Sequence, residues 1–197
     1  MKQLLILPVL LLTLLVGTPA SSAEWNKGYA AYKSGDYATA LREWTPLAKQ
    51  GNAGIQSLVG SMYNEGQGVP QDYKTAVKWW KLAAEQGYAG AQYNLGLMYD
   101  KGDGVPQDYK TALKWYRLAA EQGDANAQTL LGTSYALGNG VIQDNVYAHM
   151  WGNLAASNGS ENGGKLRDNF EKKMTPSQLE KSQDLARECV RKKYKGC

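Results

Sequence analysis

Apolar residues recur at helical spacing along most of this chain, in segments separated by short stretches that contain glycine. Between residues 53 and 63, apolar and small residues return every three or four positions, which places them on one face of a helix. The positions expected on that face are Gln56, Val59, Gly60 and Tyr63. This pattern predicts an amphipathic α-helix.

A second helix is expected shortly after the first. Gly66 and Gly68 favour the end of a helix and a tight loop, and Pro70 prevents the preceding residue from continuing the helix. Asp72 suits the N-terminal cap, because its carboxylate can accept hydrogen bonds from the free N–H groups of the first turn. The expected helix runs to about Gln86, with an apolar face of Ala76, Trp79, Leu82, Ala83 and Ala84.

The two-helix pattern repeats with a period of 36 residues. Residues 51–86 and 87–122 are identical at 24 of 36 positions, and residues 123–158 form a third, more divergent copy. A fixed period of this length indicates stacked two-helix units, each stabilised by its neighbours. The cap position recurs as Asp72, Asp108 and Asp144.

One glycine is repeated inside the first helix of every copy, as Gly60, Gly96 and Gly132. A glycine in the middle of a helix costs on the order of 1 kcal/mol relative to alanine. We therefore expect another backbone to approach the first helix at this position, where a Cβ would not fit.

The first 23 residues differ from the rest of the chain. Lys2 precedes an apolar run from Leu4 to Val16, and small residues lead up to Ala23. This order is typical of a secretory signal peptide, cleaved after Ala23 or, as second choice, after Ala20. The apolar run is too short to cross a bilayer, which takes about 20 residues. The leader predicts an exported protein, periplasmic or secreted, without a transmembrane span.

The segments that flank the repeats are expected to close the stack at its ends. Residues 24–50 carry a disguised copy of the helix pair and resemble a tetratricopeptide pair with a tight turn. Residues 159–197 lose the period, and we expect a C-terminal helical cap of two helices there. The second cap helix should begin at Thr175, because Thr175 and Gln178 form a capping-box pattern around Pro176.

The sequence from Ala89 to Gly123 resembles the Sel-one-like repeat (SLR), a 36-residue relative of the tetratricopeptide repeat. The resemblance extends over residues 51–159, and the third copy departs from it at Ile142 and Asn145. It implies an all-α fold, a right-handed α–α superhelix (solenoid) of helix pairs. It also implies a non-catalytic adaptor that binds a protein or peptide in the concave groove lined by the first helices.

Within the first helices, one stripe of positions differs between copies, whereas the packing positions are shared. The stripe consists of Ser57, Ser61 and Asn64, then Tyr93, Leu97 and Asp100, then Thr129, Thr133 and Ala136. Positions that meet a partner are free to differ, so this stripe is the predicted partner-binding surface; drift on a solvated face would produce the same variation. Tyr93 and Leu97 are expected to form an exposed aromatic–aliphatic hot spot.

The repeats carry 11 basic and 13 acidic residues between positions 24 and 162, whereas residues 163–197 carry 10 basic and 5 acidic residues. The basic end suits either a solvated cap or contact with an anionic surface. No nucleic-acid partner is expected, because the aromatic residues alternate with alanine and leucine and are not interleaved with basic residues. The chain is expected to be a monomer.

The sequence offers no catalytic, cofactor-binding or metal-binding set. One histidine and two cysteines cannot form a zinc site of the His/Cys type, and no phosphate-binding loop or G-x-S-x-G elbow is present. His149 takes the place of Val77 and Leu113 in the other copies, so a satisfied, partly buried side chain is expected.

Two alternatives to the scaffold remain open. One is an envelope hydrolase like the β-lactamase-like members of the SLR family, although those relatives carry a cysteine pair in each repeat and this chain has none there. The other is a protein that binds a cell-wall ligand in the groove.

Cys189 and Cys197 are close in sequence in a chain expected to be exported, so we predict a disulfide between them.

Overall fold

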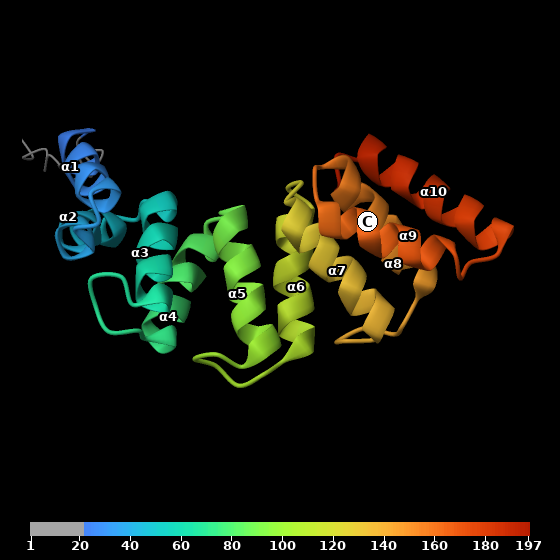
Figure 1. Ribbon diagram of the computed structural model, residues 1–197, viewed down its shortest axis with the longest axis horizontal. Coiled ribbons are helices and arrows are strands. Elements are labelled where there is room, and N and C mark those ends of the chain that lie inside the picture. The colour runs from blue at the N-terminus through green and yellow to red at the C-terminus, as the bar shows by residue number, and fades with distance from the viewer. Residues whose placement is uncertain (1–21) are drawn as a thin grey trace, which may run out of the picture.

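The computed structural model describes residues 22–197, which fold into ten α-helices without a strand in that range (Figure 1). The leader expected at residues 1–23 lies, apart from its last two residues, outside the described range. The helices are α1 (Ser22–Lys33), α2 (Tyr37–Lys49), α3 (Ala53–Glu65), α4 (Tyr73–Glu85), α5 (Ala89–Lys101), α6 (Tyr109–Ala120), α7 (Ala125–Leu137), α8 (Asn145–Ser157), α9 (Glu161–Glu171) and α10 (Pro176–Arg191).

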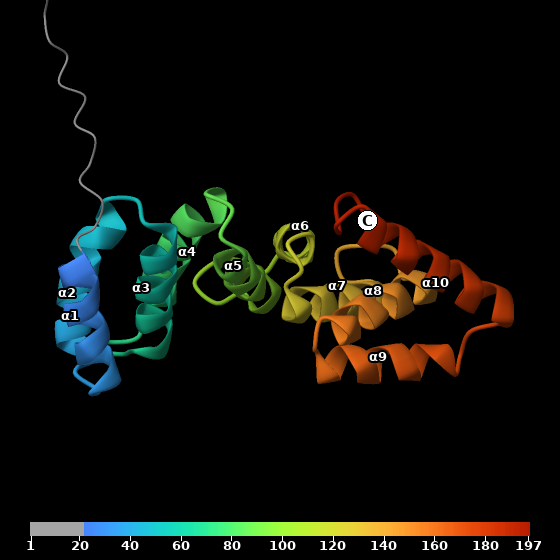
Figure 2. The ribbon, with the colours of Figure 1, turned by 90° about the horizontal axis from the view of Figure 1, so that it is seen from above.

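Each helix from α1 to α8 packs against the next one in sequence, which produces an elongated stack of helix pairs (Figures 1 and 2). The expected all-α solenoid is confirmed. Among the described helices, none combines the length and the apolar character that crossing a membrane would require.

Side-chain caps set where the second helix of each pair begins. The caps expected in the three copies are confirmed, and Asp36 takes the same role for α2. Thr175 and Gln178 form the expected capping box at the start of α10. Such caps satisfy N–H groups that have no partner within the helix, so the local sequence is enough to position these ends.

At the glycine repeated inside each first helix, the nearest neighbour is a side chain and not, as expected, another backbone. A Cβ on Gly60 would lie 2.8 Å from the indole of Trp80, and one on Gly96 would lie 2.5 Å from the ring of Tyr116. On Gly132 the nearest atom would belong to Leu166 of the cap helix α9, at 2.8 Å. In the first two copies, a large aromatic side chain of the second helix therefore packs over the glycine of its own pair, whereas in the third copy the nearest side chain comes from the cap helix α9.

Close backbone approach occurs instead at the loop glycines. A Cβ on Gly68 would lie 2.5 Å from the backbone of Tyr37, at the start of α2. Gly104 and Gly140 meet the starts of α4 and α6 in the same way. Because these glycines also have positive φ angles, they combine a left-handed turn with a contact between adjacent repeats.

The buried face of α4, the second helix of the first copy, is rotated relative to the apolar face expected from the sequence. Trp80 is 2% exposed, whereas Leu82, which was assigned to the buried face, is 46% exposed. Trp79 is half-buried. The face is turned because the residue that packs over Gly60 of α3 is Trp80, whereas its neighbour Trp79 packs against the core cluster of α2 and α3.

Buried glutamines connect successive pairs. Gln56, Gln92 and Gln128 each donate from Nε2 to a carbonyl near the end of the preceding second helix, at 2.9–3.1 Å. Each of their side-chain oxygens accepts from an amide thirty residues later, from Gln86, Gln122 and Asn158 respectively. These bonds satisfy polar groups inside the stack and hold neighbouring pairs in register.

The two cap helices lie on opposite sides of α8 (Figure 2). Helix α9 packs on α7 and α8, and α10 packs on α8. Gly152 permits the approach of α9, because a Cβ there would lie 2.8 Å from the backbone nitrogen of Arg167.

His149 lies inside the contact between α8 and α10. Its Nδ1 is hydrogen-bonded to Ser182 Oγ at 2.7 Å, so the expected satisfied histidine is confirmed. At 2% exposure it is more deeply buried than expected, and burial lowers its pKa.

Candidate partner-binding groove

The stripe predicted to bind a partner lies on the first helices α3, α5 and α7, and its second and third copies lie along the seam between consecutive first helices. Thr129 Oγ1 is 2.9 Å from the hydroxyl of Ser160, the residue that caps α9. In the preceding copy, Tyr93 takes the position equivalent to Thr129. Burial raises the pKa of Tyr93, and the nearby charge of Asp124, the cap of α7, adds to this rise. Tyr93 and Thr129 thus lie on the side of their helices that faces the next first helix.

This placement limits what the stripe can offer to a partner. Ser57 and Ala136 are buried, and the other seven positions are half-buried. The expectation that Tyr93 and Leu97 are exposed is therefore wrong: both pack against the core cluster formed by α6, α7 and α8. Their role in binding stays a prediction.

The half-burial of this pair changes the expected result of truncating it. We expect the double substitution Tyr93→Ala and Leu97→Ala to lower the free energy of unfolding by about 2 kcal/mol in total, because half-buried side chains lose part of the 2–5 kcal/mol typical of buried ones. Thermal and urea denaturation followed by circular dichroism measure the loss. An unchanged melting temperature would show that these side chains contribute little to packing.

A cleft of about 440 Å³ opens where the seam reaches the cap, between α7, the loop before α8, and α9. Two positions of the predicted stripe, Thr133 and Ala136, line it. Leu166 and Phe170 of α9 contribute apolar surface, and Leu137, which is 64% exposed, stands at its edge. The volume falls within the range of sites that bind small ligands or single side chains of a partner.

Polar groups surround this apolar surface. Gln143, Asn145 and Asn169 bring amide groups to the cleft, and Lys173 places its ammonium 5.1 Å from the centre of the Phe170 ring. Gln143 Nε2 also donates to the carbonyl of Ala136 at 2.8 Å, which holds the loop against the end of α7. A lining that combines apolar side chains with amide and ammonium groups suits an apolar side chain together with the polar backbone of a peptide.

The residues of α9 in this cleft were missed by the sequence analysis, because the 36-residue period is lost after the third copy. The spacing of Leu166 and Phe170, four positions apart in a predicted helix, is the signal that could have indicated a contact face. Which part of the stack that face meets is visible only in the folded chain.

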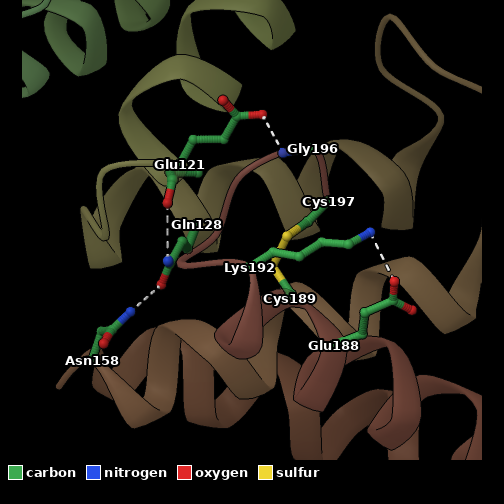
Figure 3. The surroundings of a disulfide bond; sticks show 9 residues. Glu121, Gln128, Asn158, Glu188, Cys189, Lys192, Gly196 and Cys197 are labelled. Carbon is green, nitrogen blue, oxygen red and sulfur yellow. Dashed lines mark hydrogen bonds and ion pairs between the residues drawn. A yellow bond between two sulfur atoms is a disulfide. The ribbon is translucent and has the colours of Figure 1, made fainter.

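The C-terminal tail folds back onto the last joint of the stack (Figure 3). The predicted disulfide between Cys189 and Cys197 is present, with an S–S distance of 2.02 Å. The backbone N–H of Gly196 donates to Glu121 at 3.2 Å, and the hydroxyl of Tyr194 donates to Asn158 at 3.1 Å. The tail is thereby held against the end of α6 and the end of α8.

Among the described residues, no group of three histidine, cysteine, aspartate or glutamate side chains is arranged to hold a metal ion. The two cysteines are both in the cap and its tail.

Comparison with known proteins agrees with this architecture. A family model described as the Sel1 repeat matches residues 56–88, 89–124 and 125–160. Among curated proteins, no significant match was found.

Two solved structures are similar over most of this chain. A Sel1 repeat protein from Oxalobacter formigenes has a TM-score of 0.70 and 36% identity, with 74% of this chain and 60% of that chain covered. A protective antigen of uropathogenic Escherichia coli with an SLR fold has a TM-score of 0.62 and 30% identity, with 87% of this chain and 45% of that chain covered. This chain therefore spans about half the length of those two proteins.

The three matched repeats cover more than half of the sequence, and each coincides with a helix pair that carries the same glycine position and the same glutamine contacts. The chain belongs to the Sel1 repeat family.

Proposed function

We propose that this chain is a non-catalytic interaction scaffold of the bacterial cell envelope that binds a protein or peptide partner along its first-helix seam. The observation that carries the proposal is the cleft between α7 and α9, where apolar surface is surrounded by amide groups and Lys173. Sel1 repeat proteins are in general non-catalytic helical scaffolds, which agrees with this role.

The proposed location outside the cytoplasm rests on two features. The Cys189–Cys197 disulfide requires an oxidising compartment to persist. The leader expected at residues 1–23 would direct the chain there.

A random dodecapeptide library displayed on phage tests the proposal, with the purified chain as bait. We expect wild-type protein to enrich peptides that carry an apolar residue, and Leu137→Asn to weaken binding of the best of them about thirtyfold, which corresponds to the loss of about 2 kcal/mol at one interface hot spot. Fluorescence anisotropy with the selected peptide measures the change. Leu137 is mostly exposed, so the melting temperature should hardly move.

Leu82→Asn is the matched control, because Leu82 is also an exposed leucine near the end of a helix but lies on the second helix α4. It should leave peptide affinity unchanged. Equal losses from both variants, or failure of the wild type to enrich any peptide, would contradict the proposed groove. Hydrolysis of the β-lactam nitrocefin by the purified chain would favour the alternative of a β-lactamase-like envelope hydrolase instead.

A further inference from the structure

The second copy differs from its neighbours at the side chain that fills the glycine site. In the preceding pairs this side chain is tryptophan: Trp44 Nε1 donates to Trp25 at 3.5 Å, and Trp80 Nε1 donates to Ser57 at 3.1 Å, in both cases to a backbone carbonyl. In the second copy it is Tyr116, which is 1% exposed. Its hydroxyl finds no hydrogen-bond partner among the described residues.

The Tyr116 hydroxyl is directed toward Asp100. A Cβ on Gly96 would lie 2.5 Å from the side of the Tyr116 ring and 3.3 Å from Cζ, which carries the hydroxyl. Asp100 follows Gly96 by four residues on α5, so the two share one face of the helix. The hydroxyl and the carboxylate are close enough to affect each other, although they do not reach hydrogen-bond geometry.

Asp100 is a half-buried carboxylate whose charge is not matched. In the range 22–197, none of the ion pairs involves it, and no hydrogen bond reaches its carboxylate; the backbone carbonyl of Asp100 accepts from Gln107 Nε2 at 2.7 Å. Burial raises the pKa of Asp100, against the smaller opposing effects of the Tyr116 hydroxyl and the neighbouring Lys101. Burial and the charge of Asp100 raise the pKa of Tyr116 as well.

We propose that Asp100, near the C-terminal end of α5, accepts an arginine or lysine side chain of the peptide partner. The inference rests on the proposed function, because it identifies the chemistry of the partner that the same seam would bind. A bound cation would compensate for the partial desolvation of the carboxylate. Leu97, three residues earlier on the same helix face, is half-buried, and the part of it that stays exposed can contact the methylene groups of such a side chain.

Asp100 and its neighbours favour a basic side chain over an inorganic cation. A hard cation such as Ca²⁺ takes six or more oxygen ligands, and this place offers a single carboxylate and a phenol. The apolar neighbour Leu97 is of no use to a metal ion, whereas it matches the stem of lysine or arginine.

The random dodecapeptide phage library tests the inference when it is panned in parallel on four forms of the full chain: wild type, Asp100→Asn, Glu85→Gln and Tyr116→Phe. We expect wild type to enrich arginine or lysine at one position relative to the unselected library. Asp100→Asn should reduce that enrichment to the background while apolar residues are still selected. Glu85→Gln removes an exposed carboxylate of α4 that is paired with Lys81, so it should select as wild type does.

Tyr116→Phe keeps the carboxylate and removes only an unpartnered hydroxyl, so it should retain both the basic preference and the melting temperature. For the best wild-type peptide, replacing its arginine or lysine by citrulline or norleucine should reduce affinity about tenfold. The same replacement should have little effect on binding to Asp100→Asn.

The outcomes separate the two proposals. The role of Asp100 is overturned if the wild type selects peptides without arginine or lysine, or if Asp100→Asn selects basic residues as strongly as the wild type does. Either result is still compatible with peptide binding in the groove. Selection of no peptide at all counts against the groove itself. Melting curves of Asp100→Asn confirm that a change in selection does not reflect loss of the fold.

Discussion

Replacing Trp80 by alanine should lower the free energy of unfolding by about 3–5 kcal/mol, the range found for large aromatic residues in protein cores. Trp80 is 2% exposed and inserts over Gly60, so its removal leaves a cavity between α3 and α4. It also removes the indole donor to the carbonyl of Ser57. Urea denaturation followed by circular dichroism measures the loss.

The adjacent tryptophan supplies a matched control for this variant. Trp79→Ala truncates the same type of side chain one position away, and because Trp79 is only half-buried, the cost should be clearly smaller. Equal losses from the two variants would mean that the residue over Gly60 does not dominate the packing of this pair. In a repeat protein the damage should also spread to the adjacent pair, because each unit is stabilised by its neighbours.

Removing the disulfide with Cys189→Ala and Cys197→Ala should lower the free energy of unfolding by about 2–3 kcal/mol, the loop-closure contribution expected for so short a loop. The tail would be released from Glu121 and Asn158, because hydrogen bonds at the surface do not by themselves hold a short terminal segment. Hydrogen exchange should therefore accelerate in residues 192–197, while the repeats 51–122 stay protected.

Wild-type protein treated with a reductant is the control for the alanine pair, because it retains both side chains and loses only the bond. It should reproduce the exchange pattern of the double variant. Before reduction, alkylation of the exported protein under non-reducing conditions should add no label. Two labels in the intact mass would show free thiols and refute the pairing.

Local features of this chain could be read directly from its sequence. The 36-residue period, the helix starts at Asp72, Asp108 and Asp144 and the capping box at Thr175 depend on residues close together along the chain. Caps and loop glycines act through the nearest backbone groups, so their effect does not depend on how distant segments pack. For the same reason the cysteine pair, eight residues apart, could be predicted.

The candidate groove could be predicted only in part. Thr133 and Ala136 belong to the variable stripe and line the cleft, but Leu166, Phe170 and Lys173 come from a segment without the repeat signature. Their neighbours are set by the approach of α9 to α7 and α8, which depends on Gly132 and Gly152. No spacing within α9 indicates which helix it will meet.

The sequence by itself determined the number and type of the repeated units, because periodic apolar residues, caps and glycines act within a few turns of helix. Only the tertiary structure decided which faces of those helices are buried. Trp79 and Trp80 are neighbours on a broad apolar face, and the glycine of the opposing helix selects Trp80 for the interior. Tyr93, Leu97 and Asp100 differ between copies as surface residues do, yet all three are half-buried, and Tyr93 and Leu97 pack against residues of later helices, because stacking brings together residues that are far apart in sequence.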